Sequence, residues 1–337
     1  MARVHIDPMA NIYYASFYLK GLYDLFGKRN VLFTSSPFKD LKNRKENFNF
    51  VVSNSSKEKR FSISYDDSHE IKKECYEWCD QYGSVNSNRN KTPQEYQKKL
   101  IPLAPCFGIR LWNIKDTIGI ASTNYFKTNQ FANFRKFVGK YKRQYKYRLP
   151  ISRYYPVKPE DNFLFHVSTL WPSDEWVRNN DYVNRMRAVF IKTCKSIPDV
   201  HFEGGFYYNR KFPLLENFND MVYEKYMPIH DYIEKTKRSF LVFNTPAWLN
   251  CNGWKLGEYL ALGKAIVSSP LVNDLPEPLI HGENVHFVSD DPFDIKDAII
   301  FIHRNSRYRD KIASGAYQYF MRNASPVKSL ELLGVTY

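Results

Sequence analysis

The segment of residues 239–270 constrains the fold more than any other part of the chain. It opens with a short apolar run, SFLVF at 239–243, which is typical of a strand buried on both faces of a parallel sheet. A helical pattern follows between Asn252, a good N-cap, and Gly263, a good helix stop, and a second apolar run covers 265–267. Strand, helix and strand of this size predict a right-handed parallel crossover. Such sheets bind ligands beyond the carboxyl ends of their strands.

Two charged residues stand near the start of that helix. Lys255 lies in the first turn, where a cation opposes the helix macrodipole at a cost of roughly 0.3–1 kcal/mol, and a bound anion would remove the conflict. Glu258 lies one turn deeper on nearly the same face, where a carboxylate can accept hydrogen bonds from a sugar diol. A lysine on phosphate and a glutamate on ribose would hold a nucleotide diphosphate. The structural alternative is a solvated lysine and a glutamate in a surface ion pair.

The surrounding residues resemble a known family. Residues 257–268, GEYLALGKAIVS, resemble the donor-site segment of group-1 glycosyltransferases, in which a glutamate on a helix precedes a small-residue turn and a buried strand. Residues 273–288 resemble the family's following loop and strand, and the helical stretches within 293–323 resemble its closing helices. One position departs from the pattern, because Asn250 stands where many relatives carry a second acidic residue. The role of Glu258 is therefore the one that carries over.

The resemblance implies the GT-B fold, an α/β fold of two Rossmann-like domains that face each other across a cleft, with a C-terminal helix that crosses back. We expect an acceptor domain at 1–152, a nucleotide-sugar donor domain at 160–318, and a tail at 319–337 that returns to the first domain. A chain of 337 residues suits two domains. The segment 149–159, with three prolines in eleven residues, is the best linker candidate.

Hydrophobic patterning predicts the other elements. In the first half we expect strands at 3–7, 30–34, 48–53, 61–65, 104–109 and 117–120, and helices at 12–26 and 71–81. In the second half we expect strands at 163–168 and 200–203 and a helix at 183–196. This alternation is typical of Rossmann-like domains.

Residues at the ends of the second-half strands are the candidates for binding the donor. They are Ser168, Thr169, Gly204, Gly205, Phe243, Asn244, Thr245, Gly253, Trp254, Lys255 and Glu258. Arg185 and Arg187 follow on the next helix, and only one of them can face the site because helical neighbours two apart diverge by about 200°. An arginine there could bind phosphate in a bidentate manner, or it could form a structural salt bridge.

The catalytic residue is less defined. An inverting transfer needs a general base for the acceptor hydroxyl, and the candidates are Asp7, Asp66, Asp67 and His69, which follow predicted strands of the first half. A retaining enzyme of this fold can lack such a base and use the donor phosphate instead. Each candidate acid also has a structural interpretation as a helix cap or turn former.

A net charge of +14 indicates anionic partners. The run from Arg135 to Arg148 carries seven basic residues in fourteen. Three interpretations stay open: a solvated helix face, a patch on an anionic membrane surface, and a nucleic-acid surface in which tyrosines interleave with the cations. No nucleic-acid-binding motif accompanies the run, so we expect no nucleic-acid partner.

Other patterns limit the cofactor and the compartment. The pair Asp66-Asp67 is not the DxD of metal-dependent transferases, and no G-x-G-x-x-G follows a strand, so we expect neither a metal, nor a nicotinamide cofactor, nor a dehydrogenase. No window approaches ~18 uninterrupted apolar residues, and the first residues do not resemble a signal peptide. With five scattered cysteines that suggest no disulfide framework, a cytoplasmic protein is expected, peripheral on the inner membrane face if the basic run binds lipid.

The sequence therefore predicts a metal-independent, hexosyl-type glycosyltransferase of surface polysaccharide synthesis. Its partners would be a nucleotide sugar as donor and a saccharide or lipid-linked saccharide as acceptor. The alternative from a different class is a basic nucleic-acid-binding protein that uses the run from Arg135 to Arg148.

Overall fold

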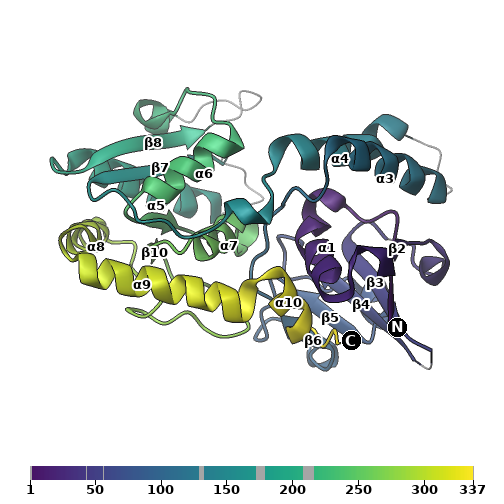
Figure 1. The fold of residues 1–337 in the computed structure, drawn as a ribbon. Coiled ribbons are helices and arrows are strands. Elements are labelled where there is room, and N and C mark those ends of the chain that lie inside the picture. The colour runs from purple at the N-terminus through teal and green to yellow at the C-terminus, as the bar shows by residue number, and fades with distance from the viewer. Residues whose placement is uncertain are drawn as a thin grey trace. The chain divides into compact units, whose positions relative to one another are not determined.

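The structure is a computed structural model. It describes residues 2–42, 44–55, 57–128, 133–171, 179–207 and 216–336. The chain divides into two compact units (Figure 1). Unit 1 comprises Met1–Arg153, Asn273–Pro278 and Met321–Tyr337, and unit 2 comprises Tyr154–Val272 and Leu279–Phe320.

Unit 1 is built on a mixed sheet with the strand order β2-β1-β3-β4-β5-β6. The strands are β1 (Arg3–Ile6), β2 (Val31–Phe33), β3 (Asn47–Ser53), β4 (Glu58–Ser64), β5 (Gln81–Ser84) and β6 (Leu100–Pro102). β3 runs antiparallel to both of its neighbours, while the pairs β1–β2, β4–β5 and β5–β6 are parallel. The carboxyl ends of β1 and β4 therefore lie at the same edge of the sheet.

The helices of unit 1 are α1 (Ile12–Phe26), α2 (Lys73–Trp78), α3 (Ile114–Lys127), α4 (Phe134–Tyr147) and α10 (Pro326–Leu332). α1 is apolar on most faces because it packs against both α4 and α10, and α3 and α4 run side by side (Figure 1). Gly21 permits the close contact between α1 and α10, since a Cβ at this position would lie 2.3 Å from the carbonyl oxygen of Pro326. The last helix of the chain is thus part of the core of unit 1.

Unit 2 contains two small parallel sheets. β7 (Phe163–Thr169) pairs with β8 (His201–Tyr207), and β10 (Ile266–Ser268) lies between β9 (Val242–Asn244) and β11 (His286–Phe287). The backbone amide of Phe240 donates to the carbonyl of Phe163 at 2.9 Å, which connects β7 to the segment that leads into β9. The carboxyl ends of β7 and β9 consequently lie together.

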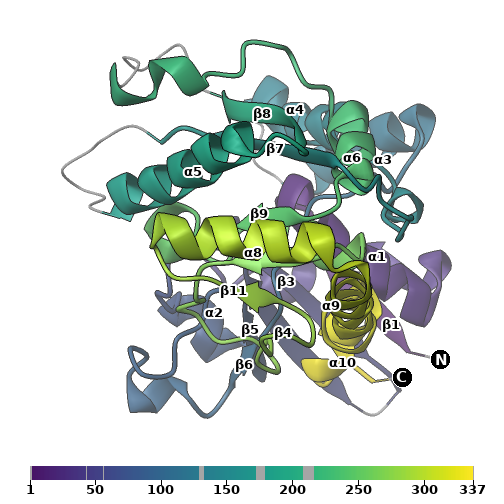
Figure 2. The same ribbon diagram turned by 90° about the vertical axis from the view of Figure 1, so that its left-hand side faces the viewer.

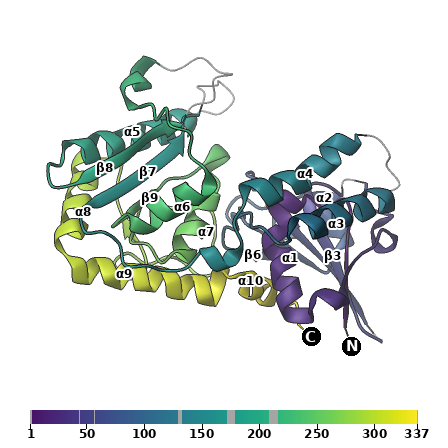
Figure 3. The same cartoon turned by 45° about the horizontal axis from the view of Figure 1, so that its top comes forward.

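The helices of unit 2 are α5 (Asn179–Ser196), α6 (Ile229–Arg238), α7 (Trp254–Ala261), α8 (Pro292–Arg304) and α9 (Ser306–Tyr319). Alternate residues of β7 enter different cores. Leu164 packs in the cluster that holds Met186 and Phe190 of α5, whereas Phe163 and Phe165 pack with residues on the side of α6. The two helices therefore cover opposite faces of β7 (Figure 3), and α8 lies beside α5 (Figure 2).

The predicted α/β fold is confirmed, as are the crossover of unit 2 and helix 12–26. The crossover helix begins one residue later than predicted, with Gly253 as its N-cap. None of the helices in the described part of the chain has the length and hydropathy needed to span a bilayer.

Three predictions in the first half are wrong. Residues 117–120 lie inside α3 rather than in a strand, because the side chain of Asn113 caps that helix and accepts from the amide of Asp116 at 2.9 Å. Residues 104–109 are buried but pair in no sheet, and β5 and β6 were not predicted. The helix expected at 71–81 is short, since α2 ends at Trp78 and β5 begins at Gln81. The sheet itself is mixed, because β3 runs antiparallel to β1.

Candidate functional site

A pocket of about 130 Å³ opens where β7 and β9 of unit 2 end. We name it the unit 2 pocket. Its lining residues come from the end of β7, from α5, from the end of β9 and from the start of α7: His166, Ser168, Thr169, Trp171, Arg187, Phe243, Asn244, Thr245, Ala247, Gly253, Trp254 and Lys255. Among these described lining residues none is acidic. Nine of the predicted donor-site residues thus come together in one place.

Arg187 is buried in this pocket and is held on three sides. Its Nε donates to the hydroxyl of Thr245 at 2.9 Å, and its two terminal nitrogens donate to the carbonyls of Thr169 at 2.8 Å and Pro246 at 3.4 Å. Burial lowers its pKa to about 10, so the guanidinium stays charged at neutral pH. The guanidinium is therefore a cation fixed at the carboxyl ends of β7 and β9.

Lys255 brings a second cation to the same pocket from the first turn of α7. Its Nζ donates to the carbonyl of Val167 and lies 5.6 Å from the centre of the Tyr232 ring. Burial lowers the pKa of Lys255 to about 7, with a further contribution from Arg187, while Glu258 acts in the opposite direction. The ammonium is thus only partly populated at neutral pH, and a bound anion would favour its charged form.

His166 also lines the pocket and was not singled out from the sequence. Its Nε2 lies 3.1 Å from the hydroxyl of Ser168. Burial, together with the charges of Lys255 and Arg187, lowers its pKa well below the ordinary value, so the imidazole is neutral. Strand alternation could have identified it, because His166 and Ser168 lie two apart on β7 and share one face.

Asn244 lines the pocket, whereas Glu258 lies on α7 outside the lining. The Nδ2 of Asn244 donates to the hydroxyl of Ser268 at 2.9 Å, which ties the end of β9 to that of β10. Glu258 is buried on α7, one turn after Lys255, and does not line the cavity itself. Its carboxylate acts to raise the pKa of both Lys255 and Tyr232. The pKa of Tyr232 lies well above its ordinary value, mainly through burial. The predicted contact of Glu258 with a ribose remains a prediction.

Four predicted donor-site residues lie outside the pocket lining: Glu258, Arg185, Gly204 and Gly205. Arg185 is exposed on α5, so Arg187 is the one of the two arginines that faces the cavity. Gly204 and Gly205 lie in β8 and serve close backbone packing. A Cβ on Gly204 would lie 1.9 Å from the carbonyl oxygen of His166, and one on Gly205 would lie 2.4 Å from that of Met221.

The candidates for a base lie in unit 1, at the carboxyl ends of β1 and β4. Asp7 is fully buried; its Oδ1 accepts from the amide of Met9 at 2.9 Å, and its Oδ2 has no hydrogen-bond partner among the described groups. Burial raises the pKa of Asp7 to about 6, although Arg44, 4.0 Å away, opposes this. Asp7 therefore keeps one oxygen without a described partner, and its role as the base stays a prediction.

The other candidates have ordinary surroundings. Asp66 pairs with Lys72 at 3.1 Å and accepts from the amide of Ser68 at 3.3 Å, which is the geometry of a turn. Asp67 and His69 are exposed. Within the described residues, no three His, Cys, Asp or Glu side chains gather as metal ligands, and the expectation of a metal-independent reaction stays a prediction.

No protein-family model and no curated protein matches the chain. Among solved structures it is similar to the C-terminal domain of LpcC, a group 1 family glycosyl transferase of Francisella tularensis, at 14% identity over 52% of this chain and 97% of that one, with a TM-score of 0.37. It is also similar to HepE of Anabaena in complex with UDP and glucose, at 14% identity over 76% and 77% of the two chains, with a TM-score of 0.38.

A third similar structure is TarM of S. aureus, at 11% identity over 96% of this chain, with a TM-score of 0.46. The present chain spans only 58% of TarM. The first of these structures is described as a group 1 family glycosyl transferase. Similarity at this level assigns no activity to the chain.

Proposed function

We propose that the chain is a glycosyltransferase whose unit 2 pocket binds the diphosphate of a nucleotide sugar. The observation that carries this proposal is the convergence of Arg187 and Lys255 on a cavity with no acidic residue among its described lining. Burial of the two basic side chains disfavours their charged forms, and Glu258 offsets this only in part for Lys255. A diphosphate would supply the missing negative charge.

The same arrangement suits the chemistry of sugar transfer. Breaking the bond between sugar and diphosphate places negative charge on the leaving oxygens, and fixed cations stabilise that charge without reorganisation. Arg187 is held in place by its three hydrogen bonds, and the first residues of α7 line the same pocket as its N-cap Gly253. Because the pKa of Lys255 is about 7, diphosphate binding would draw a proton onto this residue.

The finer parts of the proposal concern the donor and the acceptor. The donor sugar would be a hexose-type unit, its ribose would contact Glu258, and the transfer would need no metal. The acceptor would be a saccharide, free or lipid-linked, and the product a surface polysaccharide assembled in the cytoplasm. Solved HepE structures contain UDP and UDP-glucose, which makes these compounds natural first probes.

A thermal-shift screen tests the proposal. The purified protein is heated with UDP, GDP, ADP, CDP, their sugar conjugates and the corresponding free nucleosides. The proposal predicts that at least one nucleoside diphosphate raises the melting temperature at micromolar concentration, whereas its nucleoside does not. Lys255→Gln should lose that response. Arg185→Gln, which removes an exposed cation from α5, the helix that carries Arg187, should keep it. Equal responses to nucleoside and diphosphate would contradict the proposal.

A further inference from the structure

Unit 1 contains a second basic cavity, which shares no residue with the unit 2 pocket. It shares Met9 with the surroundings of Asp7 and two lysines with the basic run. It has a volume of about 190 Å³, more than tenfold the roughly 10–15 Å³ that a single water requires. We name it the unit 1 pocket. Its lining residues come from the loop after β1, the turn before β3, the end of α3 and the start of α4: Met9, Lys45, Thr128, Asn133, Lys136, Phe137 and Lys140.

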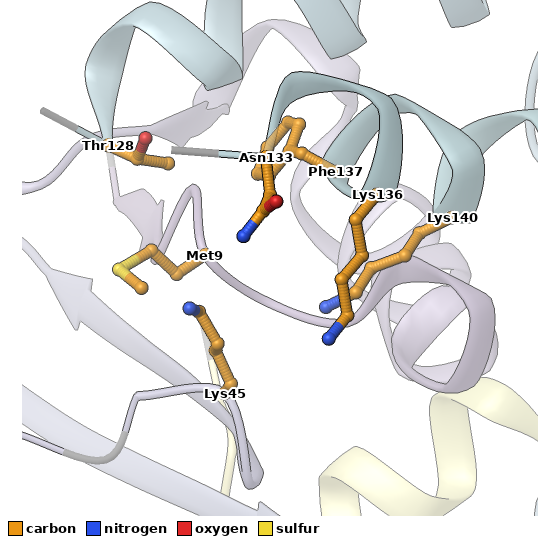
Figure 4. Close-up of a pocket in the computed structure, with 7 residues that line it drawn as sticks. All are labelled: Met9, Lys45, Thr128, Asn133, Lys136, Phe137 and Lys140. Carbon is orange, nitrogen blue, oxygen red and sulfur yellow. The ribbon is translucent and has the colours of Figure 1, made fainter. Parts of the chain in front are cut away.

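Three of the seven lining residues are lysines, and none of the seven is acidic. Figure 4 shows Lys136 and Lys140 extending side by side from α4, while Asn133 and Lys45 point toward one another across the cavity. The cations act on each other: the pKa of Lys140 is lowered first by burial and then by Lys45, Lys136 and Arg143. Like charges held this close are unfavourable unless an anion lies between them.

The sequence of α4 places these lysines on one stripe of the helix. At 100° per residue, Lys136, Lys140 and Arg143 fall within about 60° of each other, whereas Arg135, Lys142 and Lys146 form a second stripe roughly 100° away. Both stripes carry exposed residues, Lys136 and Arg143 included, but none of the second stripe lines the pocket. The basic run is therefore not a single patch: Lys136 and Lys140 of the first stripe line the unit 1 pocket, while the guanidinium of Arg143 lies 5.5 Å from the centre of the Tyr13 ring.

The pocket also adjoins the candidate base. Met9 lies two residues after Asp7, and its backbone amide donates to that carboxylate at 2.9 Å. Lys45 follows Arg44, the cation that lies 4.0 Å from Asp7. The loop after β1 thus carries a buried carboxyl and also contributes Met9 to a cation-lined cavity.

We propose that the unit 1 pocket binds a phosphate group carried by the acceptor, so that the acceptor is a phosphorylated saccharide. Asn133 and the lysines would donate hydrogen bonds to the phosphate oxygens. The binding of phosphate stands on the cavity alone, and the identification of the phosphate as the acceptor's rests on the proposed function. Met9 would place such a phosphate beside the loop that carries Asp7, whose own carboxyl is buried and does not line the cavity.

Isothermal titration with a soluble sugar phosphate tests this proposal. The full chain is first saturated with UDP so that the unit 2 pocket is occupied, and inorganic phosphate and glucose 1-phosphate are then titrated. The double variant Lys136→Gln/Lys140→Gln should weaken binding by about tenfold or more, since each lost charged hydrogen bond corresponds to roughly that factor. The matched control Lys142→Gln/Lys146→Gln removes the same charge from the same helix and should change affinity less than about twofold.

Lys45→Gln provides an independent variant on another element and should also weaken binding. Equal losses in the α4 double variant and its control, or no saturable binding by the unmodified protein, would overturn the proposal.

Vesicles containing phosphatidylglycerol separate the sources of phosphate. If the double variant loses vesicle binding but retains binding of the soluble sugar phosphate, the pocket serves a lipid headgroup and the acceptor proposal is wrong. UDP binding is measured in the same samples. If UDP does not bind, the proposed function fails, and the phosphate titration is still read from the lysine variants.

Discussion

The two basic pockets differ in how their cations are held. In the unit 2 pocket, Arg187 and Lys255 donate to backbone carbonyls at the ends of strands, so their positions are set by the sheet itself. In the unit 1 pocket, Lys136 and Lys140 stand on a helix surface, where lysine stems adopt many rotamers. A fixed arginine suits a ligand with one required orientation, such as a diphosphate in a reacting complex. Flexible lysines suit a charged group whose position varies from one acceptor to the next.

The largest expected effect concerns the carboxyl beside the unit 1 pocket. In an inverting enzyme, Asp7→Asn should lower turnover by about 10²–10⁴ while the affinity for UDP holds, because the base is lost and the donor pocket is intact. Asp66→Asn is the control, since Asp66 pairs with Lys72 in a turn and should only cost stability. Initial rates and UDP titrations on both variants make the measurement. Normal turnover in Asp7→Asn would show that Asp7 is not the base.

Arg187 offers the next test, because its three hydrogen bonds hold the structure and its proposed role is to bind the diphosphate. Arg187→Gln should lower the free energy of unfolding by about 2–4 kcal/mol, since three buried hydrogen bonds are disturbed, and should also weaken diphosphate binding. Arg185→Gln, two residues away and exposed, should stay within about 0.5 kcal/mol of the unmodified protein. Urea unfolding of both variants measures the difference. Equal stability of the two would contradict the account of a fixed cation.

Glu258 separates ribose binding from support of the pocket. If its carboxylate accepts hydrogen bonds from the ribose, Glu258→Gln should weaken nucleoside and nucleoside diphosphate alike, by about 1.5–3 kcal/mol. If it acts only through Lys255, the loss should be confined to the diphosphate. Titrations with uridine and UDP decide between the two roles. Unchanged affinity for both ligands would exclude both roles.

The pH dependence of binding gives the smallest effect. The pKa of Lys255 falls from an ordinary 10.5 to about 7 in the unliganded fold, through burial and Arg187, while a bound diphosphate favours the ammonium. Binding should therefore take up a proton above pH 7, and UDP affinity should fall by at most tenfold per pH unit between about pH 7.5 and 9. In the absence of ligand, stability should rise with pH between about 7 and 10.5, because only the unfolded chain holds the proton there.

Calorimetry in buffers of different ionisation enthalpy measures the proton uptake directly. His166 should not contribute, because its pKa is already well below the ordinary value and it is neutral throughout this range. A UDP affinity that stays constant from pH 7.5 to 9 would show that Lys255 does not contact the phosphates.

The sequence predicts the unit 2 pocket far better than the rest of the molecule. Apolar runs with helices between them place their carboxyl ends at one edge of a sheet, so the order of residues along the chain is enough to assign Ser168, Thr169 and Asn244 to one site. Sequence alone does not decide which of Arg185 and Arg187 faces the pocket. That choice depends on the rotation of α5, which the core around Met186 and Phe190 sets.

Unit 1 is harder to predict for physical reasons. The stretch TIGI at 117–120 has strand propensity, but the cap at Asn113 and the packing of α3 on α4 favour the helix. The unit 1 pocket collects lysines from positions 45, 136 and 140, and no local pattern relates the first to the other two. The charge excess is visible in the sequence, while its division into two stripes depends on where α4 begins and on which of its faces packs.

Calorimetric titration of UDP and uridine into the unmodified protein and Lys255→Gln tests the central claim most directly. The account predicts that UDP binds the unmodified protein at least about tenfold more tightly than uridine does, because the phosphates meet Arg187 and Lys255. It also predicts that Lys255→Gln removes most of this difference and leaves the affinity for uridine unchanged. A preference for UDP that survives the substitution intact would contradict the account.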